Sequence, residues 1–141
     1  MLLKGKRIFI VEDNLSNRVV FQMMLLVEGA TIEFERWGRD AVLRLQRFSD
    51  VDLIILDLML HNGVSGYDIF QEIRQRPEFD KIPIVAVSAA DASVAIPKTQ
   101  QMGFSGFIAK PINDDVFATY LAAILAGEQV WHSGDRIAGK V

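Results

Sequence analysis

The sequence predicts an α/β fold in which helices cover both faces of a parallel sheet. Short apolar runs, each long enough for one strand, recur along the chain, and segments with apolar residues at helical spacing separate them. Most of these runs are unbroken, which is typical of strands buried on both faces. Strand and helix alternate five times. With right-handed crossovers, this pattern favours a flavodoxin-like, doubly wound sheet of five strands in the order 2-1-3-4-5.

The predicted strands share β-branched and aromatic content and are bounded by turn residues. They are residues 7–11, 30–35, 51–56, 84–87 and 107–109. The run that starts at Val51 is the most apolar, and it ends abruptly in the carboxylate of Asp57. The run over 30–35 instead alternates, with Ile32 and Phe34 on one side and two glutamates on the other, which suits an edge strand.

The predicted helices place apolar residues on one face and begin or end at capping residues. They are residues 15–28, 40–48, 67–75, a segment within 89–102, and 114–126. Asn14 or Ser16 caps the first, Gly29 ends it, and Asn113 caps the last. Proline costs ~3 kcal/mol or more inside a helix. We therefore expect the fourth helix to start late, near Pro97, or to be broken there.

Length and composition indicate one intracellular domain. The chain has 141 residues, of which 50% are hydrophobic, and this suffices for a filled core. A net charge of −3 gives no reason to expect a nucleic-acid or membrane surface, and no apolar stretch reaches the ~20 residues of a membrane span. Without cysteine, disulfides and thiolate metal sites are excluded. We expect a cytoplasmic protein with a domain over residues 1–126 and a tail over 127–141 that forms no second domain.

Polar side chains follow four of the five predicted strands. Glu12 and Asp13 follow the first, Asp57 the third, Ser88 the fourth and Lys110 the fifth. In the predicted order these strands are neighbours, so their carboxyl ends converge on one crevice. Three clustered carboxylates repel one another and raise each other's pKa values, and one lysine cannot neutralise them.

A hard divalent cation resolves this repulsion. Mg²⁺ accepts one or two carboxylates, keeps several waters and leaves a position for a phosphoryl oxygen. Glu12, Asp13, Asp57 and Lys110 sum formally to −2, which one Mg²⁺ neutralises. The set suits phosphoryl transfer with Asp57 as the nucleophile that becomes an aspartyl phosphate. Lys110 then offsets charge on the phosphoryl oxygens, and Ser88 donates a hydrogen bond to one of them.

These residues resemble the receiver domain of bacterial two-component response regulators. The resemblance runs from about residue 6 to residue 125 and rests on four motifs in register at strand ends: Glu12-Asp13, Asp57, Ser88-Ala89 and Phe107-Ile108-Ala109-Lys110-Pro111. It implies the flavodoxin-like fold, a Mg²⁺ requirement, and phosphorylation of Asp57 by a phosphohistidine on a sensor histidine kinase or phosphotransfer protein. The chemistry would be limited to self-phosphorylation and self-dephosphorylation, so we expect no enzyme in the usual sense.

The resemblance also implies finer roles. The main-chain carbonyl of Met59 is expected to ligate the metal beside Asp13 and Asp57, with Glu12 acting through water. The Lys110-Pro111 peptide bond is expected to be cis. With no effector domain attached, the output would be a changed affinity for a downstream protein target.

In that output, Ser88 would move toward the phosphoryl group, and Phe107 would rotate from solvent into the space behind it. The remodelled surface would be helix four, strand five and helix five.

Several residues depart from the family pattern. His61 stands where the family usually has proline, and Gly66 lies one residue later after Asp57 than the family's loop glycine. Ser88 replaces the commoner threonine, and Phe107 holds the aromatic switch position without a hydroxyl. We interpret His61 as a solvated loop residue, and His132 in the tail likewise.

Two other functions fit parts of the pattern. An Asp-nucleophile phosphohydrolase would also use strand-end carboxylates, Mg²⁺, serine and lysine. Enzymes of that class carry an Asp-x-Asp motif after the first strand, together with a cap insertion. In this chain Asp57-Leu58-Met59 follows the third strand, and no insertion is long enough for a cap. A receiver-like interaction module that works without phosphorylation is the second alternative. The presence of Asp57, Ser88 and Lys110 argues against it, whereas the altered loop after Asp57 keeps it open.

Overall fold

Six strands alternate with five α-helices in the computed structural model, which describes residues 1–61 and 64–134. The strands are β1 (Arg7–Val11), β2 (Thr31–Glu35), β3 (Leu53–Leu56), β4 (Ile84–Ser88), β5 (Gly106–Ala109) and β6 (Val130–His132). The helices are α1 (Leu15–Val27), α2 (Ala41–Arg47), α3 (Gly66–Arg74), the 3₁₀ turn η1 (Pro77–Phe79), α4 (Ala92–Met102) and α5 (Phe117–Leu125).

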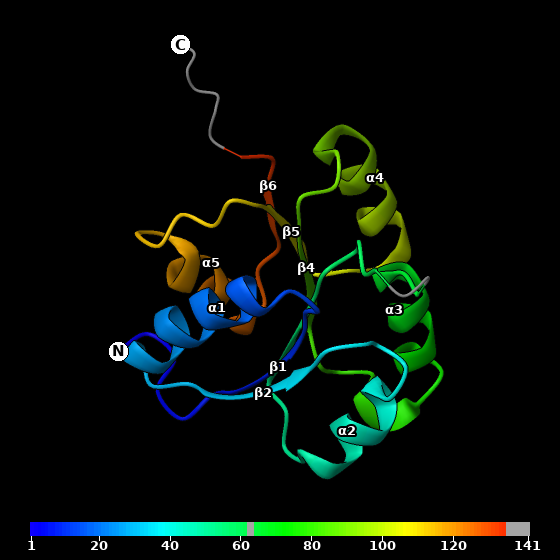
Figure 1. The fold of residues 1–141 in the computed structure, drawn as a ribbon, viewed down its shortest axis with the longest axis horizontal. Coiled ribbons are helices and arrows are strands. Elements are labelled where there is room, and N and C mark those ends of the chain that lie inside the picture. Colours follow the sequence, from blue (N-terminus) through cyan, green and yellow to red (C-terminus); the bar gives the residue numbers. More distant parts are fainter. Residues whose placement is uncertain (62–63, 135–141) are drawn as a thin grey trace.

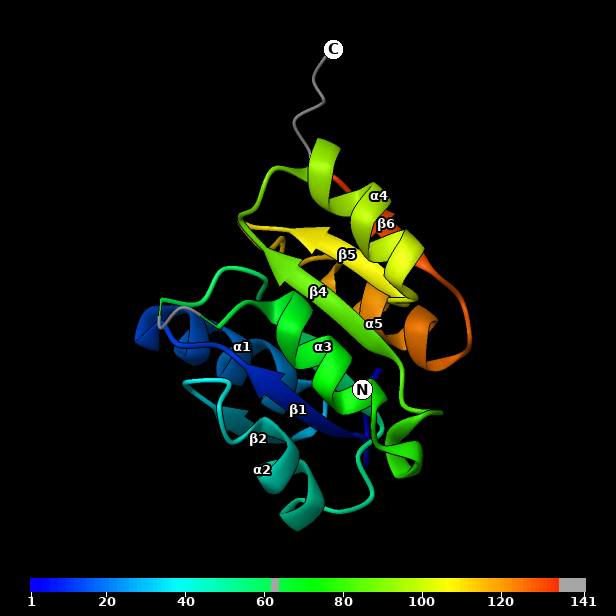
Figure 2. The ribbon, with the colours of Figure 1, turned by 90° about the vertical axis from the view of Figure 1, so that its right-hand side faces the viewer.

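All strands are parallel, and their order across the sheet is β2-β1-β3-β4-β5-β6. Helices α1 and α5 lie on one side of the sheet, and α2, α3 and α4 lie on the other (Figure 1). The same arrangement is seen from the α2–α4 side in Figure 2. The predicted doubly wound fold and the order of its first five strands are therefore confirmed. In the part of the chain that the structure describes, no helix has the length and apolarity needed to cross a bilayer.

Each central strand sends alternate side chains into two separate cores. In β1, Phe9 packs toward α2, α3 and α4, whereas Ile8 packs toward α1 and α5. In β3, Ile54 and Ile55 divide in the same way. This two-sided burial explains why the strand segments read as unbroken apolar runs.

The strand register brings the predicted site residues to one edge of the sheet. Val11 pairs with Leu56, and the next residue, Asp57, donates its backbone N–H to the Val11 carbonyl at 3.1 Å. At the other end of the site, the Lys110 backbone N–H donates to the Ser88 carbonyl at 2.9 Å. Because the strands are parallel, all their carboxyl ends lie at this edge.

The sheet has one strand more than the five predicted. Residues 130–132, within the predicted tail, pair in parallel with β5 and place Trp131 opposite Phe107. Trp131 packs against the core on the α4 side, and the His132 ring lies 5.1 Å from the Tyr120 ring on the α5 side. Three residues are too few to show a periodic pattern, so the sequence did not predict this strand. Its formation depends on tertiary packing. Residues 135–141 of the predicted tail lie outside the described residues.

The prediction that Pro97 shortens or breaks the fourth helix is wrong, because α4 runs continuously from Ala92 to Met102. Asp91 caps its first turn, accepting from the Ser93 N–H at 3.0 Å. Pro97 and Ser93, whose carbonyl loses its helical donor at Pro97, are both exposed, so water can replace the missing bond. The opposite face buries Ala95 and Thr99. Burial of that face therefore outweighs the local cost of proline.

Phe107 is fully buried in the core on the α4 side. The expectation that its side chain starts in solvent is therefore wrong. Its backbone is flanked on one side by β4 and on the other by β6, where Trp131 is its partner in register. The additional strand removes β5 from the edge of the sheet, and this is the physical reason for the difference.

Replacing Pro97 by alanine should stabilise the protein. The change restores an N–H to the helix and removes the ring from the carbonyl of Ser93, so the free energy of unfolding should rise by about 1–3 kcal/mol. Urea denaturation measures it. Pro77→Ala is the control, because Pro77 occupies the first turn of η1, where proline is well tolerated and no gain is expected. A Pro97→Ala variant no more stable than the wild type would show that α4 carries no proline penalty.

Candidate functional site

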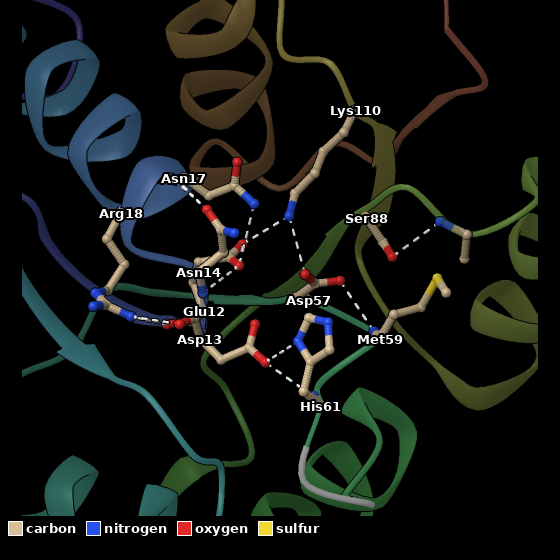
Figure 3. Close-up of polar contacts among 11 residues, drawn as sticks. Glu12, Asp13, Asn14, Asn17, Arg18, Asp57, Met59, His61, Ser88 and Lys110 are labelled. Atoms are coloured by element: carbon tan, nitrogen blue, oxygen red, sulfur yellow. Dashed lines mark hydrogen bonds and ion pairs between the residues drawn. The ribbon is translucent and has the colours of Figure 1, made fainter.

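Three carboxylates meet beyond the ends of β1 and β3. One oxygen each from Glu12, Asp13 and Asp57 lies within 4.8 Å of the others. Glu12 and Asp57 are buried, with 1% and 6% of their surface exposed. Figure 3 shows Lys110 and Ser88 reaching the same place from β5 and β4. All the predicted side chains of the site therefore come together.

Lys110 is the cation that joins these strands. Its Nζ lies 2.8 Å from Glu12 Oε1 and 3.0 Å from Asp57 Oδ2 (Figure 3). Burial would lower the pKa of Lys110, but the hydrogen bonds and charges of Glu12 and Asp57 outweigh burial and raise it above its ordinary value. Lys110 is therefore held as an ammonium. The peptide bond between Lys110 and Pro111 is cis, as the family resemblance predicted.

The loop after β3 holds the Asp57 carboxylate in place. The Met59 backbone N–H donates to Asp57 Oδ1 at 3.0 Å, and Met59 forms an isolated antiparallel bridge with Ser65. Gly66 allows this return of the chain, because a Cβ there would overlap the Asp57 carbonyl oxygen. Gly66 permits this close approach although it comes one residue later after Asp57 than the family's loop glycine. The Met59 carbonyl as a metal ligand stays a prediction.

The start of α1 supports the acidic pair through Asn14, which was predicted only as a helix cap, and through Asn17 and Arg18, for which no role was predicted. Glu12 Oε2 accepts from the Asn14 N–H at 3.2 Å and from Asn17 Nδ2 at 3.3 Å. Arg18 Nη1 donates to the main-chain carbonyls of Glu12 at 3.1 Å and Asp13 at 2.9 Å. In the sequence, only the position of Asn17 and Arg18 indicates this role: they lie in the first turns of the helix that follows the acidic pair.

Ser88 ends β4 and is fully buried. Its Oγ accepts a hydrogen bond from the Ala90 N–H at 3.2 Å (Figure 3). The hydroxyl hydrogen can therefore be donated to an oxygen that enters the site. Asp91, the N-cap of α4, comes directly after Ala90, so the Ser88 hydroxyl is connected to the start of that helix.

His61 is an exposed loop residue, as predicted, but it also contacts Asp13, which was not predicted. Its ring is 83% exposed, but Nδ1 lies 2.6 Å from Asp13 Oδ2, and its backbone N–H donates to the same oxygen at 2.9 Å. The contact could not be foreseen because it depends on how the loop after β3 folds back over β1.

The contact between His61 and Asp13 shifts the pKa of both side chains. Burial would raise the pKa of Asp13, but the hydrogen bonds and charge of His61 outweigh burial and hold it below its ordinary value. The hydrogen bond with Asp13 in turn raises the pKa of His61, and the charge of Asp13 adds to this.

The donor set fits a hard divalent cation. Asp13 and Asp57 offer carboxylate oxygens on adjacent strands, and hard cations prefer such ligands. Lys110 pairs with Glu12 and Asp57 but not with Asp13. The cluster formally keeps a charge of −2 that a divalent ion balances. Asp13 and Asp57 would hold the ion, with Glu12 placed to act through water.

The pair of His61 and Asp13 should make stability depend on pH. The raised pKa of His61 gives a contribution that is present below its ordinary value of 6.5 and is lost as pH rises through the raised value. The lowered pKa of Asp13 gives one that is present above 3.8 and is lost as pH falls through the lowered value. His61→Ala should therefore destabilise the metal-free protein at about pH 5.5 and have less effect at about pH 9.

Urea denaturation in EDTA at the two pH values measures this difference. In an Asp13→Asn background, which removes the partner charge, His61→Ala should lose its pH-dependent effect. A destabilisation that is equal at both pH values would contradict the assignment.

Comparison with known proteins agrees with this geometry. Residues 8–122 match the family model described as the response regulator receiver domain. The chain is 31% identical over 119 residues to the phosphate regulon transcriptional regulatory protein PhoB of Rhizobium meliloti (strain 1021), covering 84% of this chain but 52% of PhoB. It is 32% identical over 108 residues to the polar-differentiation response regulator DivK of Brucella ovis, covering 77% of this chain and 86% of DivK.

Solved structures agree in fold. A putative response regulator from Chloroflexus aurantiacus superposes with a TM-score of 0.80 at 24% identity, covering 87% of this chain and 99% of that one. The chemotaxis response regulator CheY4 of Vibrio cholerae superposes with a TM-score of 0.76 at 21% identity, covering 84% and 98%. With the strand-end acids, lysine and serine in register, the chain belongs to the response regulator receiver domain family.

Proposed function

We propose that this chain is a phosphorylation-driven signalling switch of a two-component system. Asp57 would accept a phosphoryl group from a phosphohistidine on a sensor histidine kinase or phosphotransfer protein, with Mg²⁺ as cofactor. The observation that carries the proposal is the buried Asp57, held between the Lys110 ammonium at 3.0 Å and the Met59 N–H at 3.0 Å beside two further carboxylates. A structural ion pair would not need the two additional acids.

The residues present can perform the transfer. An oxygen of Asp57 attacks phosphorus while the bond from phosphorus to the donor histidine nitrogen breaks, and that nitrogen keeps the electron pair. Lys110 and the Ser88 hydroxyl offset charge on the phosphoryl oxygens. The bound metal would supply further charge neutralisation. The same acids support hydrolysis of the aspartyl phosphate, so the protein would act on itself and not as an enzyme for other substrates.

The signal would leave the site through Ser88. If Ser88 Oγ moves toward a phosphoryl oxygen, the 3.2 Å bond from the Ala90 N–H would lengthen or break, and Ala90 precedes the N-cap of α4. We propose that the α4, β5 and α5 surface responds and changes its affinity for a downstream protein target in the cytoplasm. Since Phe107 is already buried, Trp131 in β6 and the start of α4 are better placed than Phe107 to change exposure.

Phosphorylation should occur on Asp57 alone. Incubation with acetyl phosphate and Mg²⁺ should add the mass of one phosphoryl group to the wild type, measured by intact mass spectrometry, and should add none to Asp57→Asn. Asp13→Ala, which removes a metal ligand, should lose the Mg²⁺-dependent part of the reaction. Equal mass gain in Asp57→Asn would rule out this acceptor, and no mass gain in the wild type would favour an interaction module that works without phosphorylation.

Lys110→Ala should separate metal binding from the response of the surface. The variant keeps Asp13 and Asp57, so Mg²⁺ should still bind. It lacks the Lys110 ammonium group that would contact the phosphoryl oxygens. Beryllofluoride, a mimic of the phosphoryl group, should change amide and indole NMR shifts in α4 and at Trp131 in the wild type and not in the variant. Lys81→Ala removes an exposed lysine outside the site and is the matched control. Wild-type shift changes in Lys110→Ala would remove Lys110 from the mechanism.

A further inference from the structure

We propose that His61 is a nitrogen ligand of the divalent-cation site, so that this chain prefers first-row transition-metal ions over Mg²⁺. The inference rests on the proposed function, because it concerns the same metal site. Its basis is the contact of 2.6 Å between His61 Nδ1 and Asp13 Oδ2, an oxygen of the carboxylate expected to hold the ion.

His61 is fixed against Asp13 by two atoms. Both its ring Nδ1 and its backbone N–H, at 2.9 Å, contact the same carboxylate oxygen. The ring covers the carboxylate from the solvent side: the Asp13 side chain is 7% exposed and that of His61 is 83% exposed. In Figure 3 the ring points into the space between the Asp13 and Asp57 carboxylates. The backbone contact positions the ring at the mouth of the site.

The separation of the two donor atoms suits a shared cation. Ligands at ~2.1 Å from one ion and at a right angle to each other lie about 3 Å apart. The observed 2.6 Å between Nδ1 and Oδ2 is a few tenths of an ångström shorter. A cation can thus be held by both atoms after a small rotation of the imidazole, without a new path for the loop.

An imidazole changes which ion the site prefers. Carboxylate, carbonyl and water oxygens suit Mg²⁺, whereas imidazole nitrogen suits later transition metals, and affinity rises from Mn²⁺ to Ni²⁺ for mixed nitrogen and oxygen sites. Lys110 already pairs with Glu12 and Asp57, whereas Asp13 pairs with the solvent-exposed ring of His61. The gain from His61 should therefore be absent for Mg²⁺, moderate for Mn²⁺ and largest for Ni²⁺.

Calorimetric titration of untagged protein with Mg²⁺, Mn²⁺ and Ni²⁺ at one pH tests this gradient. His61→Ala should lose about tenfold or more in Ni²⁺ affinity, less in Mn²⁺ affinity, and little in Mg²⁺ affinity. Pulsed electron paramagnetic resonance of the Mn²⁺ complex should show coupling to a directly bound imidazole nitrogen in the wild type and none in His61→Ala. His132→Ala removes the other histidine, in β6 beside Tyr120, and should behave as the wild type in both measurements.

The alternative is that His61 merely covers Asp13 and must leave before an ion binds. His61→Ala would then bind all three ions more tightly by the same factor, and the Mn²⁺ complex would lack nitrogen coupling. Either that result or unchanged affinities would overturn the proposal. Asp13→Ala separates it from the proposed function: this variant should lose affinity for every ion, and wild-type Mg²⁺ binding by it would refute the metal site itself.

Discussion

The position of one ammonium group organises this site. Lys110 comes from β5, yet its Nζ contacts Glu12 after β1 and Asp57 after β3. The three groups belong to segments that are far apart in the sequence, so their contact depends on the whole central sheet. Buried carboxylates without such a partner would cost several kcal/mol each. The stability of this edge and the phosphoryl chemistry proposed for it would therefore have the same source.

Around this group, the parallel sheet is a buried scaffold, and loops at its edge complete the site. The strands that lead to Glu12, Asp57 and Ser88 are buried, apart from Arg7 at the start of β1, so the backbone from which these side chains project is held by two cores. The loops that complete the site carry Met59, Ala90 and the ring of His61. This division is common where function is placed on loops that a rigid scaffold positions.

The surface beside β5 differs from the one that a five-stranded sheet would present. Strand β6 covers the edge of β5, and Trp131 lies beside the buried Phe107. Helix α4 packs against β5 and is continuous across Pro97. The edge of β5 is thus covered by residues of the same chain. A conformational change that starts at the site and reaches β5 should therefore alter the exposure of Trp131, which can be measured.

The sequence by itself determined the alternation of strands and helices, the order of the sheet and the five side chains that converge on the site. It could do so because strands buried on both faces leave unbroken apolar runs, and because a parallel sheet gathers the residues that follow those runs. Tertiary structure alone decided the sixth strand, the continuity of α4 across Pro97, the burial of Phe107 and the contact of His61 with Asp13. Each of these depends on packing or hydrogen bonding between distant segments, which outweighs local preference and leaves no periodic pattern in the sequence.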